Sequence, residues 1–153
     1  MIDVLVAGAG PTGLTTAIQL ARAGRSVRIV DAAPEAFTGS RGDGLQPRTQ
    51  EVFDDLGVID AVRAAGMEPP PVRVNFDGAF VGEKVMFEVP PSTSAVPYAS
   101  GWMVPQARTE GILRDRLAEF GVTVEFGRPL TGITQTETGV RARIGDELGE
   151  ARY

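Results

Sequence analysis

Apolar residues recur with two different spacings over the first thirty positions, and these spacings predict two strands and one helix. Residues 2–7 form a short β-branched and apolar run, which predicts a buried strand. Residues 12–23 place apolar side chains at helical spacing, and Gly24 follows as a glycine that ends the helix. Residues 26–31 predict a second strand. The pattern therefore predicts a β-α-β unit of the usual size.

The rest of the chain predicts helices and antiparallel strands, separated by two loops rich in Pro, Gly and Ser. Helical patterns cover residues 47–56, 58–65 and 106–120. The last helix has a shared apolar face made of Ile112, Leu113, Leu117 and Phe120. Strand patterns cover residues 72–89, 122–126, 130–136 and 139–145, with a further strand beginning at residue 151. The loops cover residues 32–44 and 90–105. We expect an α/β fold with an antiparallel β insertion.

Composition narrows the class of protein without identifying it. The chain has 153 residues, enough for one domain, and 42% of them are hydrophobic. The net charge of −5 argues against a nucleic-acid partner, since phosphate binding needs a basic surface. No run of 18 apolar residues predicts a membrane span, and the N-terminus lacks the features of a signal peptide. We therefore expect a cytoplasmic protein.

Cysteine and histidine are both absent from the chain. Their absence excludes thiol redox chemistry, zinc sites built on these residues, and catalysis by a Ser-His-Asp or Cys-His group within this chain. We expect no metal ligands here. If the protein is a redox enzyme, its reactive atoms must belong to a cofactor.

A glycine motif supplies the chemistry that the composition lacks. Residues 8–13 read GAGPTG, a G-x-G-x-x-G pattern that follows the first predicted strand and opens the helix. Gly8 permits the tight turn, Gly10 lets the backbone approach a pyrophosphate, and Gly13 lets helix and strand pack closely. The helix N-terminus offers N–H groups to the diphosphate. Asp31 ends the second strand and can accept hydrogen bonds from a ribose, which predicts a dinucleotide site without a 2′-phosphate.

Three segments together resemble a known family. They are the glycine pattern from residue 8 to residue 24 with Pro11, the segment SRGDGLQPRT at residues 40–49, and Gln106 followed by Glu110 and Leu113. Together they are similar to the class A flavoprotein monooxygenases, the para-hydroxybenzoate hydroxylase-like enzymes, in their phenol and polyketide hydroxylase branch. The resemblance runs over nearly all 153 residues, and the second and third segments are its more specific part.

The resemblance implies a non-covalent FAD site in a Rossmann-like domain. In such a site Thr12 and Gly13 lie on the diphosphate, and Asp31 with the backbone of Ala32 on the adenosine ribose. Arg41 lies beside the diphosphate, near where the nicotinamide cofactor docks. Gln106 bonds the ribityl chain, and the backbone near Leu130 touches the adenine. The expected cofactor-binding residues are Gly8, Gly10, Pro11, Thr12, Gly13, Asp31, Ala32, Arg41, Gln106 and Leu130.

The resemblance also implies an activity. NAD(P)H reduces the flavin, O₂ reacts with it, and an aromatic substrate, a phenol or a polyketide, is hydroxylated; no side chain of this chain is required as a catalytic acid or base. Two alternatives remain: an FAD-dependent reductase or dehydrogenase of the same superfamily, and a non-catalytic module that binds adenine nucleotides.

The resemblance covers only the N-terminal part of such an enzyme. We expect residues 1–153 to be a partial FAD-binding domain, with residues 70–105 supplying strands and a loop toward the substrate-binding side. The later Asp-Gly and Gly-Asp motifs of the family are missing, and the fragment alone should be inactive. We also expect residues 4–7 to form an unpaired apolar sheet edge, which favours aggregation.

Overall fold

A computed structural model describes residues 1–85 and 89–153, which form two compact units. Unit 1 comprises residues 1–41 and 105–153, and unit 2 comprises residues 42–104. Part of the predicted strand region at residues 72–89 lies outside the described residues.

A parallel sheet forms the centre of unit 1. Its three strands are β1 (Val4–Ala7), β2 (Val27–Val30) and β7 (Val124–Glu125), in the order β1-β2-β7. Helix α1 (Pro11–Arg22) connects the first two strands, which pair in register from Val4 opposite Val27 to Ala7 opposite Val30. The β-α-β unit expected from the apolar spacing is therefore confirmed, with each element within two residues of its expected bounds.

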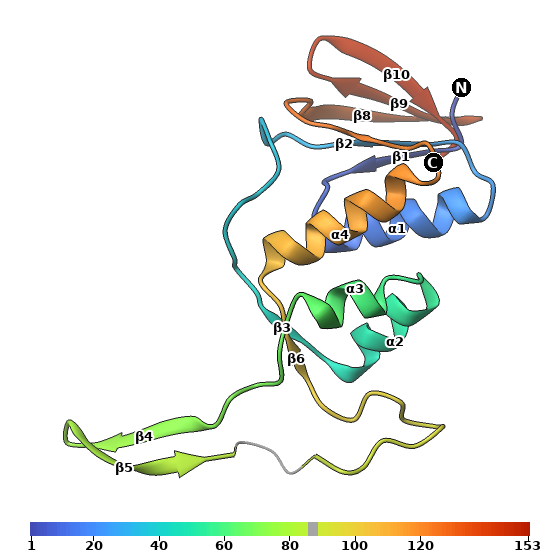
Figure 1. Cartoon of the computed structure of the whole chain (residues 1–153). Helices are drawn as coiled ribbons and strands as arrows, with labels where there is room; N and C mark the ends of the chain where they lie inside the picture. Colours follow the sequence, from blue (N-terminus) through green and yellow to red (C-terminus); the bar gives the residue numbers. More distant parts are fainter. Residues whose placement is uncertain (86–88) are drawn as a thin grey trace. The chain divides into compact units, whose positions relative to one another are not determined.

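Two helices pack side by side in unit 1 (Figure 1). Helix α4 (Gln106–Ala118) lies against α1, and the two contribute buried Leu14, Ile18, Leu113 and Leu117 to the core. The expected apolar face of α4 is only partly correct. Its buried side holds Thr109 and Glu110 beside the two leucines, whereas Ile112 and Phe120 are half-buried. A carboxylate on the buried side of a helix requires hydrogen-bond or ion-pair partners.

A second, antiparallel sheet lies in the order β10-β9-β8. Its strands are β8 (Leu130–Thr136), β9 (Gly139–Ile144) and β10 (Glu147–Ala151). The hairpin expected from residues 130–145 is confirmed, but the expectation that a strand begins at residue 151 is wrong. Strand β10 begins four residues earlier, after a tight turn in which Gly145 has φ +56°. Its sequence ELGEA is polar and lacks a strand pattern, since one face of the strand is exposed. The strand forms because its backbone pairs with β9.

The two sheets of unit 1 stack, with the helices on the other side of the parallel sheet (Figure 1). Val30, Ala142 and Ile144 form a buried cluster between the sheets, and Leu5 and Leu130 pack against it. Successive side chains of a strand point to opposite faces, so β2 uses Val30 toward the antiparallel sheet and its neighbour toward the helices. Unit 1 therefore has three layers: the antiparallel sheet, the parallel sheet and the helices (Figure 1).

The outer edge of β1 is partly covered by the residues after β10. The Arg152 N–H donates to the carbonyl of Ile2 at 3.1 Å, and the Tyr153 N–H donates to that of Asp3 at 3.0 Å. The Leu5 N–H donates in turn to the carbonyl of Tyr153 at 2.9 Å. The expectation of a wholly unpaired β1 edge is therefore wrong over its first half.

The described residues of unit 2 form two helices and two small antiparallel pairs. Its elements are β3 (Gly44–Leu45), α2 (Pro47–Asp55), α3 (Ile59–Ala64), β4 (Val72–Phe76), β5 (Ala79–Lys84) and β6 (Trp102–Met103). Strand β3 pairs with β6, and β4 pairs with β5 across the Asp77-Gly78 turn, in which both residues have positive φ. Helices α2 and α3 lie within one residue of the expected bounds 47–56 and 58–65, but the short β6 lies within the expected 90–105 loop.

Unit 2 is organised around a buried amide. Gln50 on α2 is fully buried, accepts a hydrogen bond from Nη1 of Arg63 at 2.9 Å, and donates to the carbonyl of Ser100 at 2.7 Å. The guanidinium of Arg63 lies 4.0 Å from the ring centroid of Trp102. Burial and a hydrogen bond to Asp54 raise the pKa of Tyr98 above its ordinary value. These aromatic residues therefore have structural partners within unit 2.

No helix in the described part of the chain is long and apolar enough to cross a membrane.

Candidate functional site

The turn between β1 and α1 shows why its glycines are needed. Gly8 has φ +103°, a conformation that side chains with a Cβ rarely adopt. A Cβ at Gly13 would lie 1.9 Å from the carbonyl oxygen of Gly8, so no side chain fits there. A Cβ at Gly10, in contrast, would meet no heavy atom within 4 Å. Two glycines thus serve the fold, whereas the third leaves open space beside the backbone.

The first turn of α1 is open to a ligand. Gly10 is the N-cap and provides no side-chain cap, and Pro11 has no N–H group to donate. The N–H groups of Thr12 and Gly13 belong to the first turn, where no intrahelical acceptor exists. Because the helix dipole adds partial positive charge there, this turn favours an anion such as a diphosphate.

Asp31 follows β2 and reaches the same turn. Its Oδ2 accepts a hydrogen bond from the Ala9 N–H at 2.6 Å, and its Oδ1 accepts one from the Ala33 N–H at 2.8 Å. The carboxylate therefore fixes both the glycine turn and the start of the next loop. Each oxygen retains a further lone pair, so the group can still accept a hydrogen bond from a ribose hydroxyl.

Loop 32–41 is attached to the start of α4 by two hydrogen bonds. The N–H of Gln106 donates to Oγ of Ser40, and the N–H of Arg41 donates to Oε1 of Gln106, each at 3.3 Å. Nε2 of Gln106 donates to Oε1 of Glu110 at 2.7 Å. The guanidinium of Arg41 lies 4.6 Å from the ring centroid of Phe37. Residues far apart in sequence therefore meet at the α4 N-terminus.

These features surround one cavity of about 430 Å³, which lies wholly within unit 1. Its lining residues come from the glycine turn, the loop after β2, the start of α4 and the end of β7: Ala9, Gly10, Asp31, Ala33, Pro34, Glu35, Ala36, Phe37, Thr38, Arg41, Gln106, Glu110 and Phe126. The cavity combines an anion-binding helix N-terminus, a carboxylate suited to ribose hydroxyls, a cation and two aromatic rings. The residues present therefore fit a dinucleotide, with open space at Gly10 beside the helix N-terminus.

The structure brings four expected binding residues to the cavity wall, namely Gly10, Asp31, Arg41 and Gln106. Gly8, Pro11, Thr12, Gly13 and Ala32 lie in the adjoining turn and loop without lining the cavity. Leu130 lies at the start of β8, where its side chain packs on the core between the sheets. The expected ligand contacts of all ten residues stay predictions.

Sequence reasoning missed the aromatic walls, Phe37 and Phe126, and the part played by Glu110. Phe126 directly follows β7, so it could have been found, because the carboxyl ends of parallel strands meet at one edge. Phe37 lies in an irregular loop and has no comparable sequence signal. For Glu110 the sequence offers only its place in the resemblance and indicates no physical role.

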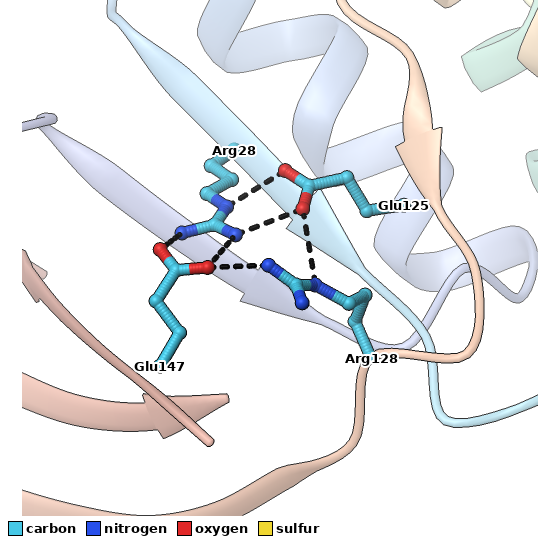
Figure 2. Close-up of polar contacts among 4 residues, drawn as sticks. All are labelled: Arg28, Glu125, Arg128 and Glu147. Carbon is cyan, nitrogen blue, oxygen red and sulfur yellow. Dashed lines mark hydrogen bonds and ion pairs between the residues drawn. The ribbon is translucent and has the colours of Figure 1, made fainter. Parts of the chain in front are cut away.

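A cluster of four charged side chains fixes the turn that carries Phe126. Figure 2 shows Arg28 of β2 between the carboxylates of Glu125 on β7 and Glu147 on β10. Nε of Arg28 lies 2.7 Å from Oε1 of Glu125, and its Nη1 lies 2.8 Å from Oε1 of Glu147. Arg128 pairs with both carboxylates. The cluster thus connects the parallel sheet to the antiparallel sheet beside the cavity.

The same contacts shift the acidity of this cluster. Hydrogen bonds from Arg28 are the main cause that lowers the pKa of both Glu125 and Glu147, and Arg128 adds to the effect. The two carboxylates in turn raise the pKa of Arg28. Arg28, Glu125 and Glu147 are therefore charged at neutral pH.

The described residues hold no group of three or more carboxylates, histidines or cysteines placed to bind a metal ion. Near the N-terminus, outside the cavity, hydrogen bonds from the backbone and side chain of Ser26 lower the pKa of Asp3.

Known proteins are similar to this chain in sequence and in fold. The family model described as FAD binding domain matches residues 1–153. A flavin-dependent monooxygenase of Mycobacteroides abscessus is 48% identical over 160 residues, which cover 99% of this chain and 34% of the relative. A 6-methylpretetramide 4-monooxygenase of Streptomyces rimosus is 36% identical over 93% of this chain and 25% of the relative.

Solved structures agree with the sequence matches. The flavin-dependent monooxygenase PieE, in complex with FAD and substrate, superposes with a TM-score of 0.81 at 26% identity, covering 99% of this chain and 29% of that protein. The rebeccamycin biosynthetic enzyme RebC with reduced flavin gives a TM-score of 0.80 at 25% identity, covering 99% of this chain and 31% of that protein. This chain spans about a third of the length of the relatives it matches.

Proposed function

We propose, from the premise that this chain belongs to the FAD binding domain family, that it is the FAD-binding part of a flavin-dependent monooxygenase. The observation that carries the proposal is the cavity of unit 1, where the uncapped first turn of α1 and the Asp31 carboxylate lie at one edge of the parallel sheet. We describe unit 1 accordingly as a Rossmann-like domain. Residues 70–105 are then an insertion that supplies strands and a loop toward the substrate.

In this proposal each wall of the cavity holds one part of FAD. The N–H groups of Thr12 and Gly13 bind the diphosphate, with Gly10 leaving room for it and Arg41 offsetting its charge. Asp31 accepts hydrogen bonds from the adenosine ribose, and the backbone N–H of Ala32 assists it.

Gln106 holds the ribityl chain, and the backbone near Leu130 borders the adenine. Bound FAD supplies the redox chemistry and the reaction with O₂, for which this chain provides no reactive side chain. The protein contributes binding, orientation and exclusion of water. This chain makes no covalent bond to the flavin through histidine or cysteine, since it has neither.

The substrate class follows from the relatives. Their names include monooxygenases acting on pentachlorophenol, rifampicin, 12-dehydrotetracycline and anhydrotetracycline. We therefore propose that the parent protein hydroxylates a small aromatic or polyketide substrate, with O₂ as oxidant and NAD(P)H as reductant. Since NAD(P)H is a cytoplasmic reductant, we place the parent in the cytoplasm.

The test uses the full-length parent. We expect a yellow protein that releases FAD on acid precipitation and oxidises NAD(P)H faster when an aromatic substrate is present. Oxygen from ¹⁸O₂ should appear in the hydroxylated product. Turnover of NAD(P)H with reduction of a double bond and no ¹⁸O in the product would indicate the reductase or dehydrogenase alternative. A colourless protein that binds ADP but no FAD would indicate a non-catalytic nucleotide-binding module.

A further inference from the structure

We propose that Glu110 is a positioning residue, whose buried carboxylate fixes the direction of the Gln106 amide and so prepares that amide for the flavin-bearing half of the cofactor. This inference rests on the proposed FAD site. It gives a role to Glu110, a residue that is almost fully buried at 4% exposure and that lines the cavity without any role in the expected site.

The position of Glu110 follows from the helix. Residues four apart lie on the same face of an α-helix, so Glu110 stands one turn after Gln106. Burial of a carboxylate is costly unless the group is paired and hydrogen-bonded. Glu110 has two neighbours of this kind: Nε2 of Gln106 donates to its Oε1 at 2.7 Å, and Nη1 of Arg114 lies 3.9 Å from its Oε2.

The Arg114 contact is the weaker of the two. Nη1 of Arg114 is buried and has no hydrogen-bond partner in the described part of the chain, so it neutralises charge without directing the carboxylate. The hydrogen bond between Gln106 and Glu110 therefore fixes the direction of the Glu110 carboxylate. The same bond fixes the direction of the Gln106 amide.

The amide of Gln106 has only one orientation that satisfies both of its neighbours. An ionised carboxylate only accepts hydrogen bonds, so the NH₂ end of the amide must face Glu110. The backbone N–H of Arg41 only donates, so the oxygen end must face loop 32–41, where the contact is 3.3 Å. A flipped amide would place two donors together at one end and two acceptors together at the other. Glu110 and Arg41 therefore select the same orientation from opposite ends.

This orientation leaves Gln106 one N–H and one oxygen lone pair for a ligand. A sugar-alcohol hydroxyl both donates and accepts, so the remaining groups match such a hydroxyl on the ribityl chain. Adenosine diphosphate has no such chain. Loss of the Glu110 contact should therefore weaken FAD binding and leave ADP binding unchanged.

Three variants of the full-length parent test the proposal. Glu110→Met keeps the length of the side chain and removes the acceptor. Glu110→Gln keeps one acceptor oxygen for Nε2 of Gln106 and removes the charge. Asp115→Met removes an exposed carboxylate from the same helix and serves as the matched control. Dissociation constants for FAD and for ADP are measured on the apoproteins by fluorescence quenching and calorimetry, together with the apoprotein Tm.

We expect Glu110→Met to raise the Kd for FAD about three- to tenfold, the effect of one lost orienting hydrogen bond. Glu110→Gln and Asp115→Met should stay within about twofold of the wild type, and all Kd values for ADP should agree within the same factor. Combining Gln106→Ala with Glu110→Met should weaken FAD binding no further than Gln106→Ala alone, because the second residue acts through the first.

Other outcomes overturn the inference. Equal FAD affinity of Glu110→Met and the wild type would show that the amide needs no such support. Equal weakening of FAD and ADP, or equal weakening by the Met and Gln variants, would show a general structural or charge effect. Tighter binding by both variants would show that the carboxylate repels the diphosphate. If the wild-type parent binds ADP but no FAD, the proposed function itself fails, and this result differs from all of these.

Discussion

Replacing Gly13 by alanine should destabilise the protein with no ligand present, because the new Cβ would lie 1.9 Å from the carbonyl oxygen of Gly8. Overpacking in a core costs about 1–3 kcal/mol. The opposing atom here belongs to the backbone of a strand turn and cannot rotate away, so we expect about 2–3 kcal/mol. For a domain of this size each kcal/mol lowers Tm by about 2–4 °C, so the apoprotein Tm should fall by roughly 4–12 °C.

The same substitution at Gly10 supplies a matched control. Gly10 has φ −73° and ψ 179°, which alanine adopts without strain, and its Cβ would meet nothing within 4 Å. The apoprotein Tm of Gly10→Ala should therefore stay equal to or slightly above that of the wild type. Its Kd for FAD should rise at least about tenfold, because the methyl group occupies the space through which we route the diphosphate.

Thermal unfolding of the apoproteins and FAD titration separate the two effects. Gly13→Ala with an unchanged Tm would show that α1 moves away from the turn at little cost. Gly10→Ala with wild-type FAD affinity would show that the diphosphate does not pass over this residue. Either result would refute the division of the motif into glycines for the fold and a glycine for the ligand.

Three further predictions follow from the charges and composition of the chain. Asp31→Ala should weaken FAD binding by about 1–3 kcal/mol and also lower the apoprotein Tm, because the carboxylate accepts the Ala9 N–H; unchanged values in calorimetry and thermal unfolding would refute the assignment. The pKa values of Glu125 and Glu147 are lowered in the folded protein. The two carboxylates therefore stabilise the folded state fully above their ordinary pKa of 4.5, and this contribution is lost as pH falls through the folded-state pKa values. Urea unfolding should therefore show Glu147→Gln less stable than the wild type at pH 7 and the difference shrinking below pH 4.5; a constant difference would contradict this linkage. Acid precipitation of the holoprotein should leave no flavin attached to residues 1–153, which include neither histidine nor cysteine; flavin that pellets with this chain would refute the prediction.

Local patterns in the sequence predicted much of the fold. The spacing of apolar residues predicted α1, α4 and the β8-β9 hairpin, because each depends on neighbours in sequence. The glycine pattern predicted the turn itself, since Gly8 and Gly13 have steric requirements that only glycine meets. Strand β10 was misplaced because it is polar and is held by pairing with β9.

The cavity walls depend on contacts that no local pattern contains. Arg28 and Glu125 are paired across 97 positions of the sequence, and each looks like an ordinary exposed charge in its own segment. The bond between Gln106 and Arg41 spans 65 positions and joins a helix start to an irregular loop. Charged and amide side chains can pair with many partners, so composition and spacing do not specify which ones meet.

The order of strands in unit 1 has a consequence for synthesis of the protein. Strand β2 pairs with β1 and with β7, and Val124 of β7 leaves the ribosome about 90 residues after Val30. At translation rates of about 5–20 residues per second, the first β-α-β unit waits roughly 5–20 s for its third strand. Phe126, which closes one side of the cavity, emerges later still. Cofactor capture in this cavity therefore cannot precede the emergence of β7, and until then β2 lacks its partner on that side.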